Sequence, residues 1–281
     1  MAGPKNEAIS VEKSSTVKSR LPVLIVAVGR GRVGKTTFLN IVGQRFRERG
    51  ARLEIWNVDP HGESGSIDAF FPDVRRPGYS GIDDRRGWLE RAIEEQSASR
   101  HDVLLDVGGG DLVLQTMLHD LDLSTIAETM GVRVVIAQLL GPIVADIDHF
   151  DASLLGSGVN GNGGKVEMLF VMNGGLIRGD TSPLKAFEPL FASPPIIEAM
   201  AKGAAVTMLP QLRCLDAVLE RGLTFRDASD RKTPAGVAPL SIFDVSRVYK
   251  WWTEGLDTMF SRIPADWLPY VETESDIAEA S

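Results

Sequence analysis

GRGRVGKTT, residues Gly29 to Thr37, is the stretch of this sequence that decides the fold. It fits the pattern G-x-x-x-x-G-K-[ST], in which glycines let a loop wrap round phosphate oxygens with its N–H groups pointing inward. An apolar run, Leu21–Val28, precedes the loop, and a segment with helical periodicity, Lys35–Arg49, follows it. The order strand, loop, helix predicts an anion site to which the positive helix end contributes.

The chemistry of this loop predicts a nucleotide-binding site. Lys35 is expected to reach the β- and γ-phosphates, and the Thr36 hydroxyl is expected to coordinate Mg²⁺. The alternative is a flexible glycine turn, which the flanking strand and helix disfavour. Nucleotide contacts are predicted for Gly29, Gly31, Arg32, Val33, Gly34, Lys35, Thr36 and Thr37.

Outward from the loop, short apolar runs alternate with helical segments. Near-continuous apolar runs are typical of strands buried on both faces of a parallel sheet. The pattern predicts an α/β fold, a doubly wound and mostly parallel sheet with helices on both faces, and ligands at the carboxyl ends of the strands. The expected strands are Leu21–Val28, Arg52–Val58, Asp102–Asp106, Val132–Leu139, Val166–Met172 and Val206–Leu209, and the expected helices are Lys35–Arg49, Asp83–Ser97, Asp111–His119, Ile143–Leu155 and Leu212–Arg221.

Acidic residues lie at the ends of two of the expected strands. Asp106 ends an apolar run and is predicted to hold Mg²⁺ or its water ligands, while Gly109 completes D-x-x-G and offers a backbone N–H to the γ-phosphate. Asp59 lies in the segment Asn57-Val58-Asp59-Pro60-His61-Gly62, where a carboxylate can orient or deprotonate an attacking water. The metal site is therefore predicted at Thr36, Asp106 and Asp59. Ordinary turns are the alternative for both acidic segments.

These motifs resemble those of the ParA/MinD group of deviant Walker-A ATPases, over residues 21–262. The segment 30–37 is similar to the K-G-G-V-G-K-T-T loop of that group, the segment 57–64 resembles D-x-D-P-Q-G-N-x, and Asp106 matches the Walker B carboxylate. The segment 170–173 looks like the strand end whose Asn reads the adenine, and 206–210 is similar to the segment beside the base. The resemblance therefore implies a P-loop NTPase fold and adenine-side contacts from Asn173 and Pro210.

The resemblance also implies catalytic roles. Lys35 and Asp59 inherit theirs from the loop and the D-P-x-G segment, and Arg30 stands where the group has a signature lysine that reaches the partner subunit's nucleotide. The other departures are Arg32 for a loop glycine, Asn57 for Asp and His61 for Gln. Arginine keeps the positive charge and binds phosphate bidentately, but it is bulkier than lysine.

The function expected from this resemblance is a molecular switch. The chain would bind ATP and Mg²⁺, dimerise with ATP, hydrolyse it slowly under stimulation by a protein partner, and position DNA or protein cargo in plasmid partition or conjugal transfer. Two alternatives stay open: a metabolic ATP-dependent ligase or kinase on the same fold, and a nucleotide-binding regulator with little hydrolysis.

Composition restricts the remaining classes. With 30 basic and 38 acidic residues the net charge is −8, which disfavours bulk nucleic-acid binding, and the lone Cys214 excludes an internal disulfide. No apolar stretch approaches the length of a membrane span, so no stable membrane insertion and a cytoplasmic location are expected. We expect a flexible polar tail at 1–20, an ATPase domain at 21–262, and a mobile acidic tail at 263–281 that carries five acidic and no basic residues.

Two surface features complete the analysis. An apolar face repeats with helical spacing near the C-terminus and is expected to dock on the sheet; it consists of Val248, Trp251, Trp252, Leu256, Met259 and Phe260. An arginine-rich stretch is interleaved with acidic residues and is interpreted as a solvated, salt-bridged face, with a DNA or partner patch as the alternative. Its arginines are Arg75, Arg76, Arg85, Arg86 and Arg91.

Overall fold

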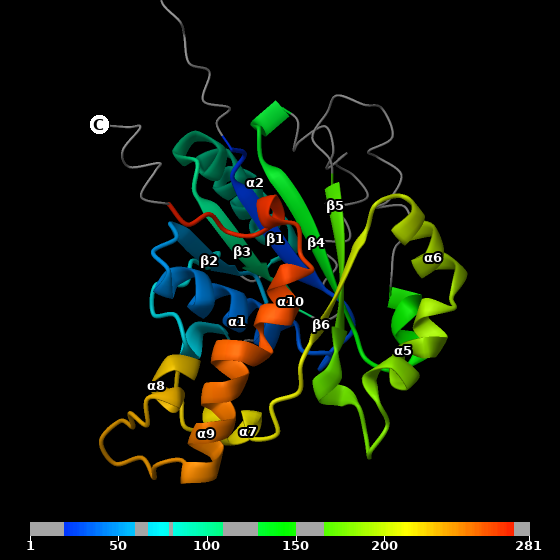
Figure 1. The fold of residues 1–281 in the computed structure, drawn as a ribbon. Coiled ribbons are helices and arrows are strands. Elements are labelled where there is room, and N and C mark those ends of the chain that lie inside the picture. Colours follow the sequence, from blue (N-terminus) through cyan, green and yellow to red (C-terminus); the bar gives the residue numbers. More distant parts are fainter. Residues whose placement is uncertain (1–19, 60–66, 79–80, 109–128, 150–165, 273–281) are drawn as a thin grey trace, which may run out of the picture.

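A parallel sheet of six strands forms the centre of the molecule in the computed structural model, which describes residues 20–59, 67–78, 81–108, 129–149 and 166–272 (Figure 1). The strand order is β2-β3-β1-β4-β5-β6, and every pairing is parallel. The α/β fold and all six predicted strands are confirmed, with ends displaced by at most two residues. The strands are β1 (Val23–Val28), β2 (Leu53–Asn57), β3 (Asp102–Asp106), β4 (Arg133–Leu140), β5 (Val166–Asn173) and β6 (Ala205–Leu209).

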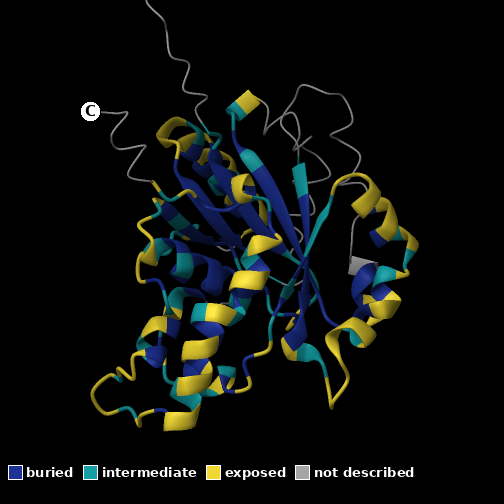
Figure 2. Cartoon of the chain, in the orientation of Figure 1, coloured by how far each residue is buried: buried dark blue, intermediate teal, exposed yellow. Residues whose placement is uncertain are grey.

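Helices cover both faces of the sheet because successive strand residues point to opposite sides. Ile25 of β1 belongs to one apolar cluster, whereas Leu24 and Val26 belong to the other. The first face packs on α1 (Lys35–Glu48), α7 (Leu215–Leu219), α8 (Phe225–Ser229) and α9 (Ile242–Lys250); the second packs on α2 (Ile82–Ser99), α5 (Pro183–Phe191) and α6 (Pro194–Ala201). Figure 2 shows the result as a buried sheet beneath helices whose outer sides are exposed.

Several predicted helices differ from the observed ones. The helix expected at 212–221 is the shorter α7, and the described part of the helix expected at 143–155 is the 3₁₀ turn η2 (Val144–His149). The helix expected at 111–119 lies outside the described residues. The sequence analysis missed α5 and α6, which each begin with a proline at the first helical position, Pro183 and Pro194, where the absent N–H is not needed.

The apolar C-terminal face docks on the sheet, as predicted. It spans α9, a π-helical turn η5 (Trp251–Gly255) and α10 (Asp257–Ser261). Val248, Trp252 and Met259 are buried, and the Thr207 hydroxyl of β6 donates to the Met259 carbonyl at 2.7 Å. Thus this segment is part of the core.

The described part of the expected acidic tail, residues 263–272, also packs on the domain, so the expectation of mobility is wrong for these residues. Trp267 and Leu268 are buried, and the Tyr270 N–H donates to Asp102 Oδ2 at 2.6 Å. The other oxygen of Asp102 accepts from the Val23 N–H at 2.8 Å. Asp102 therefore ties the start of the sheet to the chain end.

None of the described helices is both long and apolar enough to cross a lipid bilayer.

Candidate functional site

The loop between β1 and α1 has the backbone shape that its glycines permit. Gly29 and Gly34 have φ angles of 130° and 100°, in the left-handed region that favours glycine. A Cβ at Gly34 would lie 2.5 Å from Asn173 Nδ2, so close packing also demands glycine there. Arg32, which replaces a glycine of the resembled loop, adopts a φ of 62°, a conformation that costs roughly 1 kcal/mol for a side-chain-bearing residue.

Lys35 lies folded back over this loop. Its Nζ donates to the carbonyl oxygens of Gly29 at 3.2 Å and Arg30 at 3.1 Å, and the residue is only 7% exposed. Burial lowers the pKa of Lys35, while the nearby carboxylates of Asp106 and Asp59 act in the opposite direction. The ammonium is therefore poorly solvated and held by two carbonyls, an arrangement that an anionic phosphate can replace.

Thr36 and Asp106 meet beside the lysine. The Thr36 hydroxyl donates to Asp106 Oδ2 at 2.8 Å, and Asp106 is 4% exposed at the end of β3. Burial raises the pKa of Asp106 to about 6, although the Thr36 hydrogen bond and the charge of Lys35 lower it. The predicted Mg²⁺ ligands Thr36 and Asp106 thus stand in direct contact.

Asp59, just after the end of β2, faces Thr36, Asp106 and Lys35. Its carboxylate lies so close to Gly108 that a Cβ there would be 3.0 Å from Asp59 Oδ1. Its N–H donates to Asn57 Oδ1 at 2.9 Å, and Asn57 Nδ2 donates to Asp68 Oδ2 at 2.8 Å. The structure therefore brings the three predicted metal-site residues and Lys35 together. His61 and Gly109 lie outside the described residues.

The Asn57 contacts explain one departure from the resembled motif. Asn57 needs its amide N–H₂ to donate to Asp68, and an aspartate there would set one carboxylate against another. Arg76 also bonds Asp68, at 2.5 Å from its Nε. Sequence reasoning missed Asp68 and assigned Arg76 only to the arginine-rich face, because nothing in the local pattern links these two residues to the strand ends.

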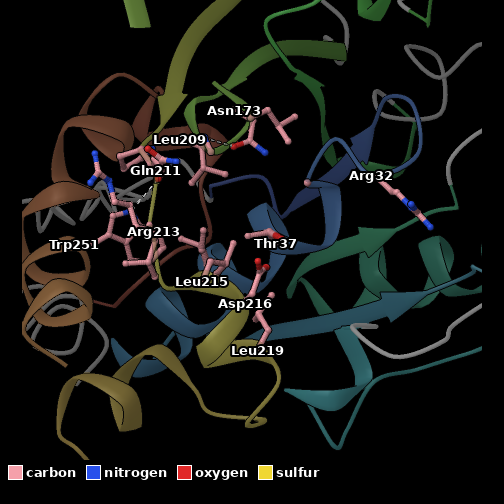
Figure 3. A pocket seen from close by; sticks show the side chains of 16 residues that line it. Arg32, Thr37, Asn173, Leu209, Gln211, Arg213, Leu215, Asp216, Leu219 and Trp251 are labelled. Atoms are coloured by element: carbon pink, nitrogen blue, oxygen red, sulfur yellow. Dashed lines mark hydrogen bonds between the residues drawn. The ribbon is translucent and has the colours of Figure 1, made fainter. Parts of the chain in front are cut away.

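Asn173 and Pro210 line a cavity of about 430 Å³ beside the loop (Figure 3). Asn173 Nδ2 donates to the Val33 carbonyl at 2.8 Å, and its Oδ1 accepts from the Gly175 N–H at 2.9 Å. The amide is thus fixed at the cavity wall by the loop and by its own turn. In Figure 3 the Arg32 side chain points away from the other labelled residues, which gather round the cavity.

The segment after β6 supplies cavity residues that the sequence analysis missed. Figure 3 places Gln211, Arg213 and Asp216 there, and Trp251 Nε1 donates to the Pro210 carbonyl at 2.9 Å. Their position directly after a parallel strand was the available signal, because ligands bind at the carboxyl ends of such strands.

Arg30 has a partner that the sequence did not indicate. Its Nε forms an ion pair with Asp146, in η2 after β4. Asp146 is 1% exposed and its Oδ2 also accepts from the Gly141 N–H at 2.6 Å. In this structure the guanidinium is therefore bound within its own chain.

The residues present fit a Mg²⁺-nucleotide. The described residues hold no group of three or more His, Cys, Asp or Glu side chains placed to bind a metal ion. Mg²⁺ normally needs fewer, since it takes one or two carboxylates together with substrate phosphates and water. The buried Gln138 Nε2, which has no hydrogen-bond partner among the described residues, lies 3.3 Å from the place of a Gly29 Cβ. The loop edge thus offers an unused donor as well as the cation of Lys35.

The arginine-rich stretch is mostly the salt-bridged face that the sequence indicated. Arg75 pairs with Glu54 and Glu95 at 3.0 and 2.6 Å, and Arg86 pairs with Glu90 at 3.1 Å. Arg85 differs: it is 6% exposed, and its Nη1 donates to the Val58 carbonyl at 3.1 Å. Arg85 thus supports the strand end that carries Asp59.

Comparisons with known proteins give matches among solved structures. No protein-family model and no curated protein sequence matches the chain. The MinC:MinD cell division protein complex and MinD, both from Aquifex aeolicus, are 16% and 15% identical; each match covers 83% of this chain and 96% or 97% of the other, with TM-scores of 0.46 and 0.45. FtsY from Mycoplasma mycoides is 15% identical over 55% of this chain and 52% of its own, with a TM-score of 0.36. The chain's own loop, strand order and side-chain contacts, rather than these likenesses, support the function proposed below.

Proposed function

We propose that this chain is an ATP-binding switch of the ParA-like class, which dimerises with ATP and hydrolyses it slowly. The observation that carries the proposal is the convergence of four chemically matched side chains at one edge of the sheet. Lys35 and Thr36 open α1, Asp106 ends β3, and Asp59 follows β2. A cation, a hydroxyl and two carboxylates beside a glycine loop are the groups that phosphoryl transfer from a nucleotide needs.

Each residue has a distinct task in this proposal. Lys35 exchanges its two carbonyl partners, Gly29 and Arg30, for phosphate oxygens. Thr36 and Asp106 would hold Mg²⁺, whose positive charge neutralises charge that develops on the phosphates. Asp59 orients the attacking water, and the N–H groups of the loop and of the start of α1 bind phosphate oxygens.

The base would enter the cavity bordered by Asn173 and Pro210. The cavity volume of about 430 Å³ lies within the range usual for small-molecule sites. An amide side chain pairs with the donor and acceptor edge of adenine. With the base in this cavity, the triphosphate extends along the loop toward Lys35, the first residue of α1.

The proposed cellular role follows from a two-state nucleotide cycle. A dimer that forms with ATP and dissociates after hydrolysis can hold and release DNA or a protein cargo, under the control of a partner that stimulates hydrolysis. We propose plasmid partition or conjugal DNA transfer as the setting.

Calorimetry tests the binding function directly. Lys35→Ala should lower the affinity for a non-hydrolysable ATP analogue with Mg²⁺ by at least about 100-fold, equivalent to about 2.7 kcal/mol. Lys202→Ala is the matched control, because Lys202 is an exposed lysine paired with Glu198 on α6. Equal affinity in the wild type and Lys35→Ala would refute the assignment of the loop. Light scattering with the same analogue tests the dimer.

A further inference from the structure

The ion pair between Arg30 and Asp146 spans two neighbouring strand ends. Arg30 follows β1 and Asp146 follows β4, and these strands pair in parallel register. Arg30 uses its Nε for this contact, and its side chain is 35% exposed. No hydrogen bond joins either Nη to the described residues. The contact thus fixes the guanidinium at one nitrogen.

Asp146 is suited to hold a cation rigidly. Both of its oxygens are engaged, one by Arg30 and the other by the Gly141 N–H at 2.6 Å. A carboxylate buried to this degree requires a compensating charge, because ionised groups lose most of their hydration inside a protein. The pair therefore restricts the rotamers of Arg30, and among the described residues it leaves the two Nη groups without a hydrogen-bond partner.

We propose that Asp146 is a positioning residue, which orients the two Nη groups of Arg30 toward the terminal phosphate of a nucleoside triphosphate. This inference rests on the proposed function and adds a residue to it. Arginine has separate nitrogens for the two tasks, with Nε on the carboxylate and the Nη pair on the phosphate. A lysine has a single nitrogen, so Asp146 and the phosphate would both have to lie within reach of that one atom.

This division of donors gives a physical reason why position 30 holds an arginine where the resembled group has a lysine. An arginine there matches a buried acidic partner at position 146, and the two residues act as a unit. The phosphate contacted belongs either to the chain's own nucleotide or to that of a second copy. Both phosphates have the same chemistry, and the mass of the complex distinguishes them.

The test is the ratio of affinities for a non-hydrolysable ATP analogue and for ADP, each with Mg²⁺, measured by calorimetry. Asp146→Asn keeps an oxygen for the Gly141 N–H but loses the charge, and it should reduce the preference for the analogue by about 10-fold. Asp73→Asn is the matched control, because Asp73 pairs with Arg47 at 2.7 Å on an exposed surface. The affinity for ADP should be the same in all three proteins.

The lysine variants separate positioning from charge. Arg30→Lys should also lose the preference, and adding Asp146→Asn should restore part of it because the lysine is released. Light scattering shows the source of the phosphate: the analogue-dependent mass of Asp146→Asn falls if the contact is to a second copy and stays unchanged if it is to the chain's own nucleotide. Either result, together with a reduced preference, supports the proposal.

Other results would overturn the positioning role or the proposed function. An Asp146→Asn variant with the preference of the wild type overturns the positioning role, as does a double variant weaker than Arg30→Lys alone. A wild type that binds no analogue overturns the proposed function, which is a different failure. Should Asp146→Asn not fold, Asp146→Glu moves the carboxylate by one methylene and should lower the preference, and an unchanged preference would overturn the positioning role.

Discussion

Replacing Asp106 with asparagine should stabilise the nucleotide-free protein while it removes Mg²⁺-dependent nucleotide binding. Burial raises the pKa of Asp106 from its ordinary value of 3.8 to about 6, and the Thr36 hydrogen bond and Lys35 offset only part of this rise. The folded state thus holds the ionised carboxylate less favourably than the unfolded state does. Asparagine has the same shape and no charge, and its oxygen can still accept from Thr36.

The magnitude follows from the pKa difference between the folded and unfolded states. A rise of about 2 units corresponds to about 3 kcal/mol of destabilisation when the group is ionised in both states. Because the folded pKa is the higher one, this destabilisation is absent well below pH 4, develops between about pH 4 and 6, and is complete above pH 6. The amide hydrogens of asparagine lack assured acceptors, which costs about 1 kcal/mol, so the net gain at pH 8 is about 2 kcal/mol.

Urea unfolding with EDTA at pH 8 and near pH 4.5 measures this difference. Asp106→Asn should be more stable than the wild type at pH 8, and the advantage should shrink or reverse near pH 4.5. Asp73→Asn is a control of opposite sign. Because Arg47 lowers the pKa of the exposed Asp73, loss of the Asp73 charge should destabilise the folded protein at pH 8 by less than about 1 kcal/mol. An Asp106→Asn variant no more stable than the wild type at pH 8 would refute the reasoning.

Further predictions concern the water-orienting carboxylate, the loop, the base and the chain end. Asp59→Ala should bind ATP but hydrolyse it at least about 100-fold more slowly and accumulate as a dimer, and single-turnover hydrolysis at the wild-type rate would reduce Asp59 to a turn residue. Gly34→Ala should lose nucleotide binding in calorimetry, because its Cβ would meet Asn173 Nδ2 at 2.5 Å in a left-handed conformation. ATP should compete for the site better than GTP, since the Asn173 amide stands at the cavity wall, and equal competition would contradict the adenine assignment. Asp102→Ala should lower the free energy of unfolding by about 2–4 kcal/mol in urea titrations, because the buried N–H of Val23 and the N–H of Tyr270 lose their acceptor.

Local sequence patterns were sufficient to predict the strands. The apolar runs predicted every strand of the sheet because strands buried on both faces are made mostly of apolar residues. The helices were less well predicted. The described part of the expected helix after β4 is a 3₁₀ turn in which Asp146 accepts the Gly141 N–H, a contact between groups that no periodicity reveals.

The sequence by itself determined the loop, the parallel sheet and the strand ends that carry Asp106 and Asp59. Glycine spacing and apolar runs act over a few neighbouring residues, so their consequences can be derived locally. Only the tertiary structure decided that Asn173 is held by Val33, across 140 positions of sequence, and that Arg30 pairs with Asp146, across 116. These contacts depend on which strands become neighbours in the sheet, and the packing of the whole core sets that order.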